Sequence, residues 1–231
     1  GRDIGRACAV KLAEEGANVA INYYSSSEGA DSAVAQITAA GGKAFALQGD
    51  LNTQAGVDAL VAKTVADFGG VDILINSAST WESGSFDEVT RDDWDRALAV
   101  NLTSPMFLSQ RIGSAMAVRG FGRIINIADV GGMRPWVHRA PHSVSKAGLI
   151  MLTRLLSQAY APHVLVNAIA PGPVLVPDGA GPQVETNLSA ETILGRIGTP
   201  GDVVDAMLYL VTAEFVTGQV LSVDGGQSER R

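Results

Sequence analysis

Short apolar runs alternate along the chain with longer segments whose apolar residues recur at helical spacing. In the first such segment, residues 6–15, Ala7, Val10 and Leu12 lie among charged side chains, and Gly16 follows as a helix stop. The same pattern predicts helices over 28–40, 55–68, 87–119, 143–161 and from 199 onwards, and strands over 18–23, 44–48, 71–76, 123–128, 164–169 and 216–223. Because the strand segments are apolar throughout, we expect a doubly wound α/β domain whose parallel sheet is covered on both faces.

Two segments depart from this regular alternation. Pro105 lies inside the segment 87–119, and we expect two helical pieces there because proline is costly in a helix interior. Residues 176–198 show no clear periodicity and hold Pro177, Gly179, Gly181 and Pro182. We interpret 176–198 as a mobile substrate loop, with a tolerated surface insertion as the alternative. Residues 1–231 are otherwise expected to form one domain.

Composition narrows the classes of function. The 231 residues carry 17 Lys and Arg against 24 Asp and Glu, a net charge of −7, and contain no basic run. This charge excludes the electrostatic footprint of a nucleic-acid binder or of a protein attached to an anionic membrane. The single Cys8 excludes an internal disulfide framework and a cysteine-based zinc site, and we predict no metal. Without a visible signal peptide or an apolar stretch of roughly 18 residues, the expected location is cytoplasmic.

The chain begins with a glycine-punctuated turn, Gly1-Arg2-Asp3-Ile4-Gly5, directly before the first helix. Such a turn presents free backbone N–H groups and a helix N-terminus, which together favour a pyrophosphate. Two glycines alone are a weak signal, and a plain loop before a helix is the alternative.

Several further motifs resemble the short-chain dehydrogenase/reductase family along nearly the whole chain. They are Gly5 as the last glycine of the turn, Asp50 after a strand, Asn76-Ser77-Ala78-Ser79, Asn101, Lys146, Pro171-Gly172 and Val223-Asp224-Gly225-Gly226. The resemblance implies a Rossmann-type doubly wound parallel sheet. It also implies that the first strand is missing and that the chain is an N-terminally shortened copy. The cofactor-binding residues it implies are Gly1, Arg2, Ile4, Gly5, Tyr23, Tyr24, Ser25, Asp50, Leu51, Asn76, Ser77, Ala78, Lys146, Pro171 and Gly172.

The residues after the strand 18–23 bear on the choice of cofactor. NAD enzymes place an acid at that position to bind the ribose 2′-hydroxyl, whereas here Tyr23 is followed by Tyr24 and Ser25. No carboxylate would repel a 2′-phosphate, and Arg2 stands where relatives that use NADP often carry a basic residue. We therefore favour NADP(H) over NAD(H), with a merely solvated Arg2 as the alternative.

The catalytic positions match the family in part. Its chemistry uses Ser, Tyr, Lys and Asn, and Asn101 and Lys146 match. Asp129 stands at the serine position and His142 at the tyrosine position, one helical turn before Lys146. Histidine is a competent acid near neutral pH, so we expect Asp129 and His142 to handle the proton. Lys146 would position the ribose and Asn101 would order a water relay; loss of the proton donor, and a weakened enzyme, is the alternative.

The aspartate at position 129 resembles the pteridine reductase branch of the family. Asp3 at the middle glycine of the turn, the run Ser77-Ala78-Ser79-Thr80-Trp81 and the stretch 171–177 agree with that branch. The resemblance implies that Trp81 stacks on a pterin, as a flat ring on an indole. A packing role for Trp81 beneath a loop is the alternative.

The predicted protein is thus an NADP(H)-dependent oxidoreductase that transfers a hydride to a carbonyl or imine carbon of a small molecule. A pterin-like ring is the favoured substrate class, with Trp81, Asp129 and His142 as substrate-binding residues. Two alternatives stay open: a 3-oxoacyl or other ketone reductase, and a nucleotide-binding protein with little catalysis. Relatives pair the helices corresponding to about 102–116 and 143–161, which implies a homotetramer.

Overall fold

The computed structural model describes residues 4–176 and 179–230. Its strands are β1 Val19–Tyr23, β2 Ala44–Gln48, β3 Ile73–Asn76, β4 Gly122–Ile127, β5 Val164–Pro171 and β6 Val220–Val223. Its α-helices are α1 Ile4–Glu14, α2 Ser27–Ala39, α3 Gln54–Phe68, α4 Arg91–Leu98, α5 Ser104–Arg119, α6 Ala140–Ala159, α7 Pro182–Ala190 and α8 Pro200–Thr212. Most lie within three residues of the predicted bounds, because the hydrophobic periods of helix and strand differ clearly here.

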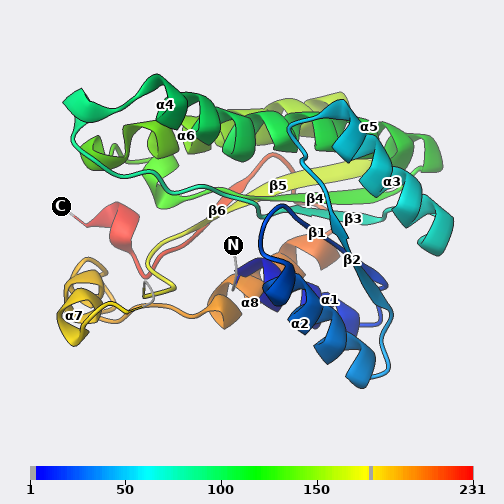
Figure 1. Cartoon of the computed structure of the whole chain (residues 1–231), viewed down its shortest axis with the longest axis horizontal. Coiled ribbons are helices and arrows are strands. Elements are labelled where there is room, and N and C mark those ends of the chain that lie inside the picture. Colours follow the sequence, from blue (N-terminus) through cyan, green and yellow to red (C-terminus); the bar gives the residue numbers. More distant parts are fainter. Residues whose placement is uncertain (1–3, 177–178, 231) are drawn as a thin grey trace.

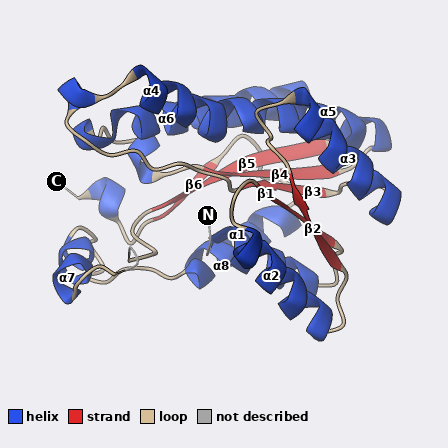
Figure 2. Ribbon diagram, in the orientation of Figure 1, coloured by secondary structure: helices blue, strands red, loops and turns tan. Residues whose placement is uncertain are grey.

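All of the strand pairs are parallel, and the strands form two hydrogen-bonded sheets (Figure 2). One contains β1 and β2, and the other has the order β3-β4-β5-β6. The expected class, parallel strands alternating with helices, is confirmed. Within the described residues, β1 and β3 are not paired with each other.

Helices cover both faces of the strands. Figure 1 shows α3, α4, α5 and α6 on one side and α1, α2 and α8 on the other. Neighbouring residues of β4 point to opposite faces, so Ile124 packs into the core beneath α5 and α6 while Ile125 packs into the core beneath α1 and α8. Both side chains are fully buried, and the two cores fix β4 between the helical layers.

The segment around Pro105 forms two α-helices, α4 and α5, as the sequence predicts. A π-helical turn, Ala99–Thr103, connects α4 to α5, and Pro105 lies in the first turn of α5. Proline is tolerated there because the first N–H groups of a helix need no partner within it. The wider turn places Asn101 toward α6 rather than ending the helix.

The segment 176–198 is not wholly a loop. It contains α7, which begins at Pro182 after Gly181. None of the α7 residues is buried, so this helix carries little of the hydrophobic periodicity by which sequence patterns reveal helices. At the end of the segment, Thr199 caps α8 and forms a capping box with Asp202, as its sequence suggests.

Candidate active site

The site lies at the carboxyl end of β4. Asp129 follows this strand and caps the short 3₁₀ turn Val130–Gly132, with its Oδ1 accepting from the Gly131 N–H at 2.6 Å. This turn lies directly against α6, because a Cβ atom on Gly132 would be 2.8 Å from the carbonyl carbon of Lys146. The glycines therefore allow the close approach that brings the Asp129 carboxylate to α6.

His142 lies in the first turn of α6 with 1% of its surface exposed. Its Nδ1 is 3.1 Å from the backbone oxygen of Thr80. Because a carbonyl oxygen only accepts, Nδ1 carries a hydrogen and donates it. Its Nε2 is buried without a hydrogen-bond partner and faces the Asp129 Oδ2 at 3.6 Å. At this separation the two atoms are too far apart for a hydrogen bond, so the Nε2 atom has no partner among the described residues.

Lys146 lies one turn after His142 on α6 and is 2% exposed. Its Nζ donates to the Ile127 carbonyl oxygen at 2.7 Å. Burial lowers the pKa of Lys146 from 10.5 to about 8, and the nearby Asp129 carboxylate partly opposes this shift. Lys146 is therefore a cation that loses its charge near pH 8.

Asn101 connects the loop after β3 to α6. Its Oδ1 accepts from the Thr80 N–H at 2.9 Å, and its Nδ2 donates to the Ser145 Oγ at 3.0 Å. The Ser145 hydroxyl donates in turn to the His142 carbonyl at 2.8 Å. Thr80 thus holds both Asn101 and His142, and the four predicted catalytic residues lie in one cluster.

The beginning of α1 lies against the end of β3. A Cβ atom on Gly5 would be 3.1 Å from the Ser77 Oγ, and that hydroxyl is buried without a hydrogen-bond partner in the described residues. Glycine at this position leaves the backbone of the helix N-terminus close to Ser77. An unpartnered hydroxyl beside a helix N-terminus fits a phosphate or ribose of a dinucleotide. Gly1 and Arg2 lie outside the described residues.

The remaining predicted cofactor residues lie at or after the carboxyl ends of β1, β2, β3 and β5 or begin α1. After β2, Asp50 accepts from the N–H and the side chain of Asn52, both at 2.9 Å, and so shapes the turn into α3. Tyr23 ends β1, Tyr24 and Ser25 are exposed beyond it, and Leu51 packs against the core. Ile4 and Gly5 begin α1, Ala78 is exposed beyond β3, and Pro171 ends β5 beside Gly172.

Asn76 has a structural role that its sequence motif does not reveal. Its Nδ2 donates to the Ser109 Oγ at 3.0 Å and to the Asn126 Oδ1 at 2.8 Å. Asn126 extends this buried chain to Thr153 on α6. The Asn76 amide therefore ties β3, β4, α5 and α6 together behind the site.

Trp81 contacts the catalytic cluster. Its ring meets the His142 ring edge-on at 4.4 Å and the Trp136 ring at 5.7 Å, measured between centroids. The Arg139 guanidinium lies over the Trp81 ring at 4.2 Å. Sequence analysis missed Trp136 and Arg139, although Arg139 precedes His142 by one helical turn, a spacing that could have signalled it.

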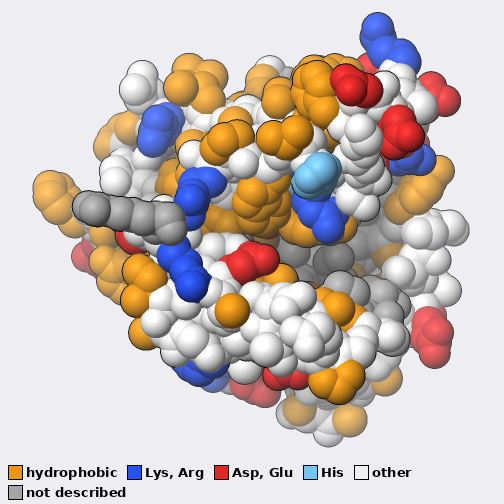
Figure 3. Space-filling model, turned by 90° about the vertical axis from the view of Figure 1, so that its left-hand side faces the viewer, with side chains coloured by type: hydrophobic (Ala, Val, Ile, Leu, Met, Phe, Trp, Pro, Cys, Tyr) orange, Lys and Arg blue, Asp and Glu red, His pale blue; other side chains and the backbone are white. Residues whose placement is uncertain are grey.

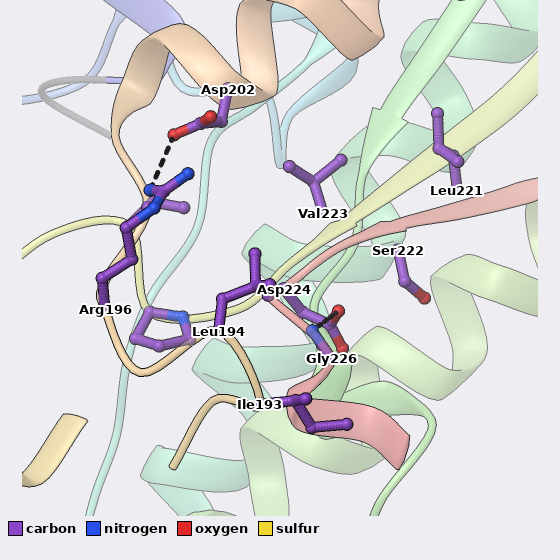
Figure 4. Close-up of a pocket in the computed structure, with 13 residues that line it drawn as sticks. Ile193, Leu194, Arg196, Asp202, Leu221, Ser222, Val223, Asp224 and Gly226 are labelled. Atoms are coloured by element: carbon purple, nitrogen blue, oxygen red, sulfur yellow. Dashed lines mark hydrogen bonds and ion pairs between the residues drawn. The ribbon is translucent and has the colours of Figure 1, made fainter. Parts of the chain in front are cut away.

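Two cavities open near the carboxyl ends of the strands. One of about 410 Å³ is lined by Val130 and Trp136 beside the site, and by Arg134, Glu191, Gln227 and Arg230 among others. The second, of about 430 Å³, lies between β6 and the start of α8, where Arg196 and Asp202 approach to 3.9 Å (Figure 4). The residues predicted for the site line neither cavity. The first cavity is nevertheless the nearer one, because its lining residue Val130 directly follows Asp129 and its lining residue Trp136 contacts Trp81.

Neither a membrane span nor a metal cluster is found in the part of the chain that the structure describes. No helix there is long and apolar enough to cross a membrane. Over the same residues, no group of three or more His, Cys, Asp or Glu side chains is placed to hold a metal ion.

Comparison with known proteins places the chain among reductases and dehydrogenases. The family profile described as enoyl-(acyl carrier protein) reductase matches residues 1–228. A 3beta-hydroxysteroid dehydrogenase 1 of Eggerthella lenta is 38% identical, with 98% of this chain and 90% of that protein covered. A 3-oxoacyl-[acyl-carrier-protein] reductase of Synechocystis is 36% identical, with 97% of this chain and 92% of that protein covered. None of these relatives is a pteridine reductase, so the finer resemblance predicted from Asp129 gains no support.

Solved structures agree with this placement. A crystal structure of a variant actinorhodin polyketide ketoreductase with NADPH matches with a TM-score of 0.93 and 30% identity, covering 99% of this chain and 94% of that one. A dehydrogenase/reductase from Sinorhizobium meliloti matches with a TM-score of 0.89 and 34% identity, covering 97% and 90%. The chain therefore belongs to the short-chain dehydrogenase/reductase family of NAD(P)-dependent oxidoreductases.

Proposed function

We propose that the protein is an NADP(H)-dependent ketone reductase. The observation that carries this proposal is the cluster of Asp129, His142, Lys146 and Asn101 at the carboxyl end of β4, the edge where α/β proteins bind ligands. Relatives named as a 3-oxoacyl reductase, a hydroxysteroid dehydrogenase and a polyketide ketoreductase support a carbonyl carbon as the hydride acceptor. This is the alternative reading from the sequence, and these relatives favour it over a pterin.

Asp129, rather than His142, is the group that gives the proton to the substrate oxygen. His142 is buried, and its two ring nitrogens face the Thr80 oxygen and the Asp129 carboxylate. The Asp129 side chain retains 16% exposure and lies beside the cavity lined by Val130 and Trp136. In this proposal His142 lies behind Asp129, and Asp129 is the residue that reaches the substrate oxygen.

The residues present fit a bound dinucleotide. The N-terminus of α1, Gly5 and the unpartnered Ser77 hydroxyl would hold the phosphates or a ribose, and Lys146 would hold the nicotinamide ribose. When bound, NADPH supplies the hydride. The absence of an acid at Tyr23, Tyr24 and Ser25 favours the 2′-phosphate of NADP(H), and Arg2 adds a positive charge in the sequence.

A pterin substrate fits the site less well. In the predicted arrangement a pterin stacks on the Trp81 ring, but the Arg139 guanidinium already lies over that ring. Trp81 also packs edge-on against His142, which supports the packing role that the sequence left open.

The test follows absorbance of NADPH and NADH with 3-oxoacyl thioesters, steroid ketones, aryl ketones and pterins. We expect NADPH-dependent reduction of a ketone, and a loss of roughly 10²–10⁴-fold in kcat for Asp129→Asn, which cannot give a proton. Adding His142→Tyr places the family's usual phenol at position 142, so the double variant Asp129→Asn/His142→Tyr should recover turnover.

Two results would overturn parts of this proposal. An Asp129→Asn variant with unchanged kcat would show that Asp129 is not the proton donor. Tight NADPH binding without turnover of any ketone or pterin would instead identify a nucleotide-binding protein with little catalysis.

A further inference from the structure

Arg139 is a positively charged side chain beside the candidate site. It ends the 3₁₀ turn Val137–Arg139 and precedes α6, three residues before His142. Its Nη1 is buried without a hydrogen-bond partner, and its guanidinium forms no ion pair in the part of the chain that the structure describes. Its one described side-chain interaction is the contact with the face of Trp81. A buried N–H group without an acceptor is unfavourable, so this position calls for an acceptor from outside the chain.

The backbone holds Arg139 in place. The Arg139 N–H donates to the Trp136 carbonyl at 2.9 Å, and the Gly84 N–H donates to the His138 carbonyl at 3.0 Å. Burial lowers the pKa of the Arg139 guanidinium, and the charge of the Asp129 carboxylate opposes that shift. Because an arginine stays protonated in proteins, the cost of burial persists until an anion binds.

Asp129 forms no ion pair with Arg139 in the residues that the structure describes. Its Oδ1 accepts from the Gly131 N–H at 2.6 Å, and its Oδ2 faces the His142 Nε2. Figure 3 shows basic side chains in blue, and acidic ones in red, around the hollow on the face that carries the C-terminus and α7. Trp81, about half exposed, and Trp136 add apolar ring surface beside Arg139.

We propose that Arg139 binds a carboxylate of the substrate, so that the preferred substrates are oxo acids with an apolar or aromatic body. The planar guanidinium fork pairs with a carboxylate through two parallel hydrogen bonds, which a neutral ester cannot match in charge. Trp136, which lines the cavity, then contacts the body of the substrate while its ketone lies near Asp129. This inference rests on the proposed ketone reductase function.

The experiment compares 4-oxo-4-phenylbutanoate and 2-oxo-2-phenylacetate with their methyl esters. In Arg139→Gln we expect kcat/KM for at least one acid to fall roughly 10- to 100-fold, mostly through KM, while its ester is unchanged. Arg139→Lys keeps the positive charge but not the guanidinium fork, so its kcat/KM for the acid should lie between those of wild type and Arg139→Gln. Arg91→Gln removes an arginine that is 84% exposed on α4 and serves as the matched control.

The same variants are titrated calorimetrically with 1-naphthoate and with its neutral analogue 1-naphthamide, in the presence of NADP⁺. Wild type should prefer the naphthoate, and Arg139→Gln should lose that preference. If no ketone is reduced but this preference holds, only the proposed function fails. If acid and ester, or naphthoate and naphthamide, respond equally to Arg139→Gln, Arg139 only supports Trp81 and the inference is wrong.

Discussion

The Lys146 ammonium is buried beside the carboxyl end of β4, where it donates to the Ile127 carbonyl. Below pH 8 it is charged in the folded and in the unfolded chain, and its burial lowers the free energy of unfolding. Between pH 8 and 10.5 the folded chain has released the proton while the unfolded chain still holds it. Because the unfolded state then binds more protons, stability rises with pH across this window.

We therefore expect wild type to gain stability relative to Lys146→Met as the pH rises from 8 to 10.5. The gain should reach at most about 3 kcal/mol, the free energy of the pKa shift. Urea unfolding of wild type and Lys146→Met at pH 7.5 and pH 10 measures this gain. Taking the difference in stability between the two proteins at each pH cancels the contributions of the other titrating groups. A difference that is independent of pH would show that the folded Lys146 keeps its ordinary pKa.

From residue spacing, the sequence analysis could predict that several of the proposed catalytic residues lie close together, but it could not predict their contacts. Lys146 and His142 share a helix face, so their proximity follows from four residues of separation. The role of His142 instead depends on the Thr80 carbonyl, 62 residues away in sequence. The orientation of the His142 ring is set by tertiary packing. The contact between the Arg139 guanidinium and the Trp81 ring also depends on tertiary packing, so the sequence did not predict that contact.

At the scale of elements, the 3₁₀ turn after β4 must lie almost in contact with α6. Gly132→Ala places a Cβ atom 2.8 Å from the backbone of Lys146, where no flexible side chain can move aside. We expect a loss of roughly 1–3 kcal/mol in the free energy of unfolding, typical of overpacking. Activity should fall as well, because the displaced turn carries Asp129.

Gly29→Ala is the matched control for that substitution. Gly29 lies inside α2, and a Cβ atom there would meet nothing within 4 Å. Alanine should therefore stabilise the helix by roughly 0.5–1 kcal/mol and leave kcat unchanged. Thermal unfolding and turnover are measured for Gly132→Ala and Gly29→Ala. Equal stability of the two variants would show that the turn after β4 shifts to accommodate the added methyl group without cost.

Elements with a buried face were predicted well, and those without one were not. The bounds of β2 agree with the predicted strand residue for residue. In contrast, α7 has no buried residue, and its segment was predicted to be a loop. The π-helical turn before α5 was missed as well, because Pro105 marks a helix start and an interruption equally well in sequence. Local pattern alone does not distinguish these cases.

At the scale of the whole molecule, apolar side chains remain exposed on the outer face of α5 and α6. Val144, Met151 and Leu155 on α6 are 46%, 52% and 58% exposed, and Phe107 on α5 is 47% exposed. The spacing of seven and four residues places the α6 side chains in one stripe. Contiguous exposed apolar surface of this kind marks an interaction site, and a second copy of the chain is the partner that the family resemblance implies.

We expect the protein to form a homotetramer through these helices. The double substitution Met151→Glu/Leu155→Glu introduces charges into the stripe and should dissociate the oligomer at micromolar concentration, since unpaired charges are costly in a buried contact. Val65→Glu is the control, because Val65 is 47% exposed on α3, outside the stripe. Sedimentation velocity measures the three proteins. A wild type that sediments as a monomer, or a double variant that stays assembled, would show that the stripe on α6 is not the contact between copies.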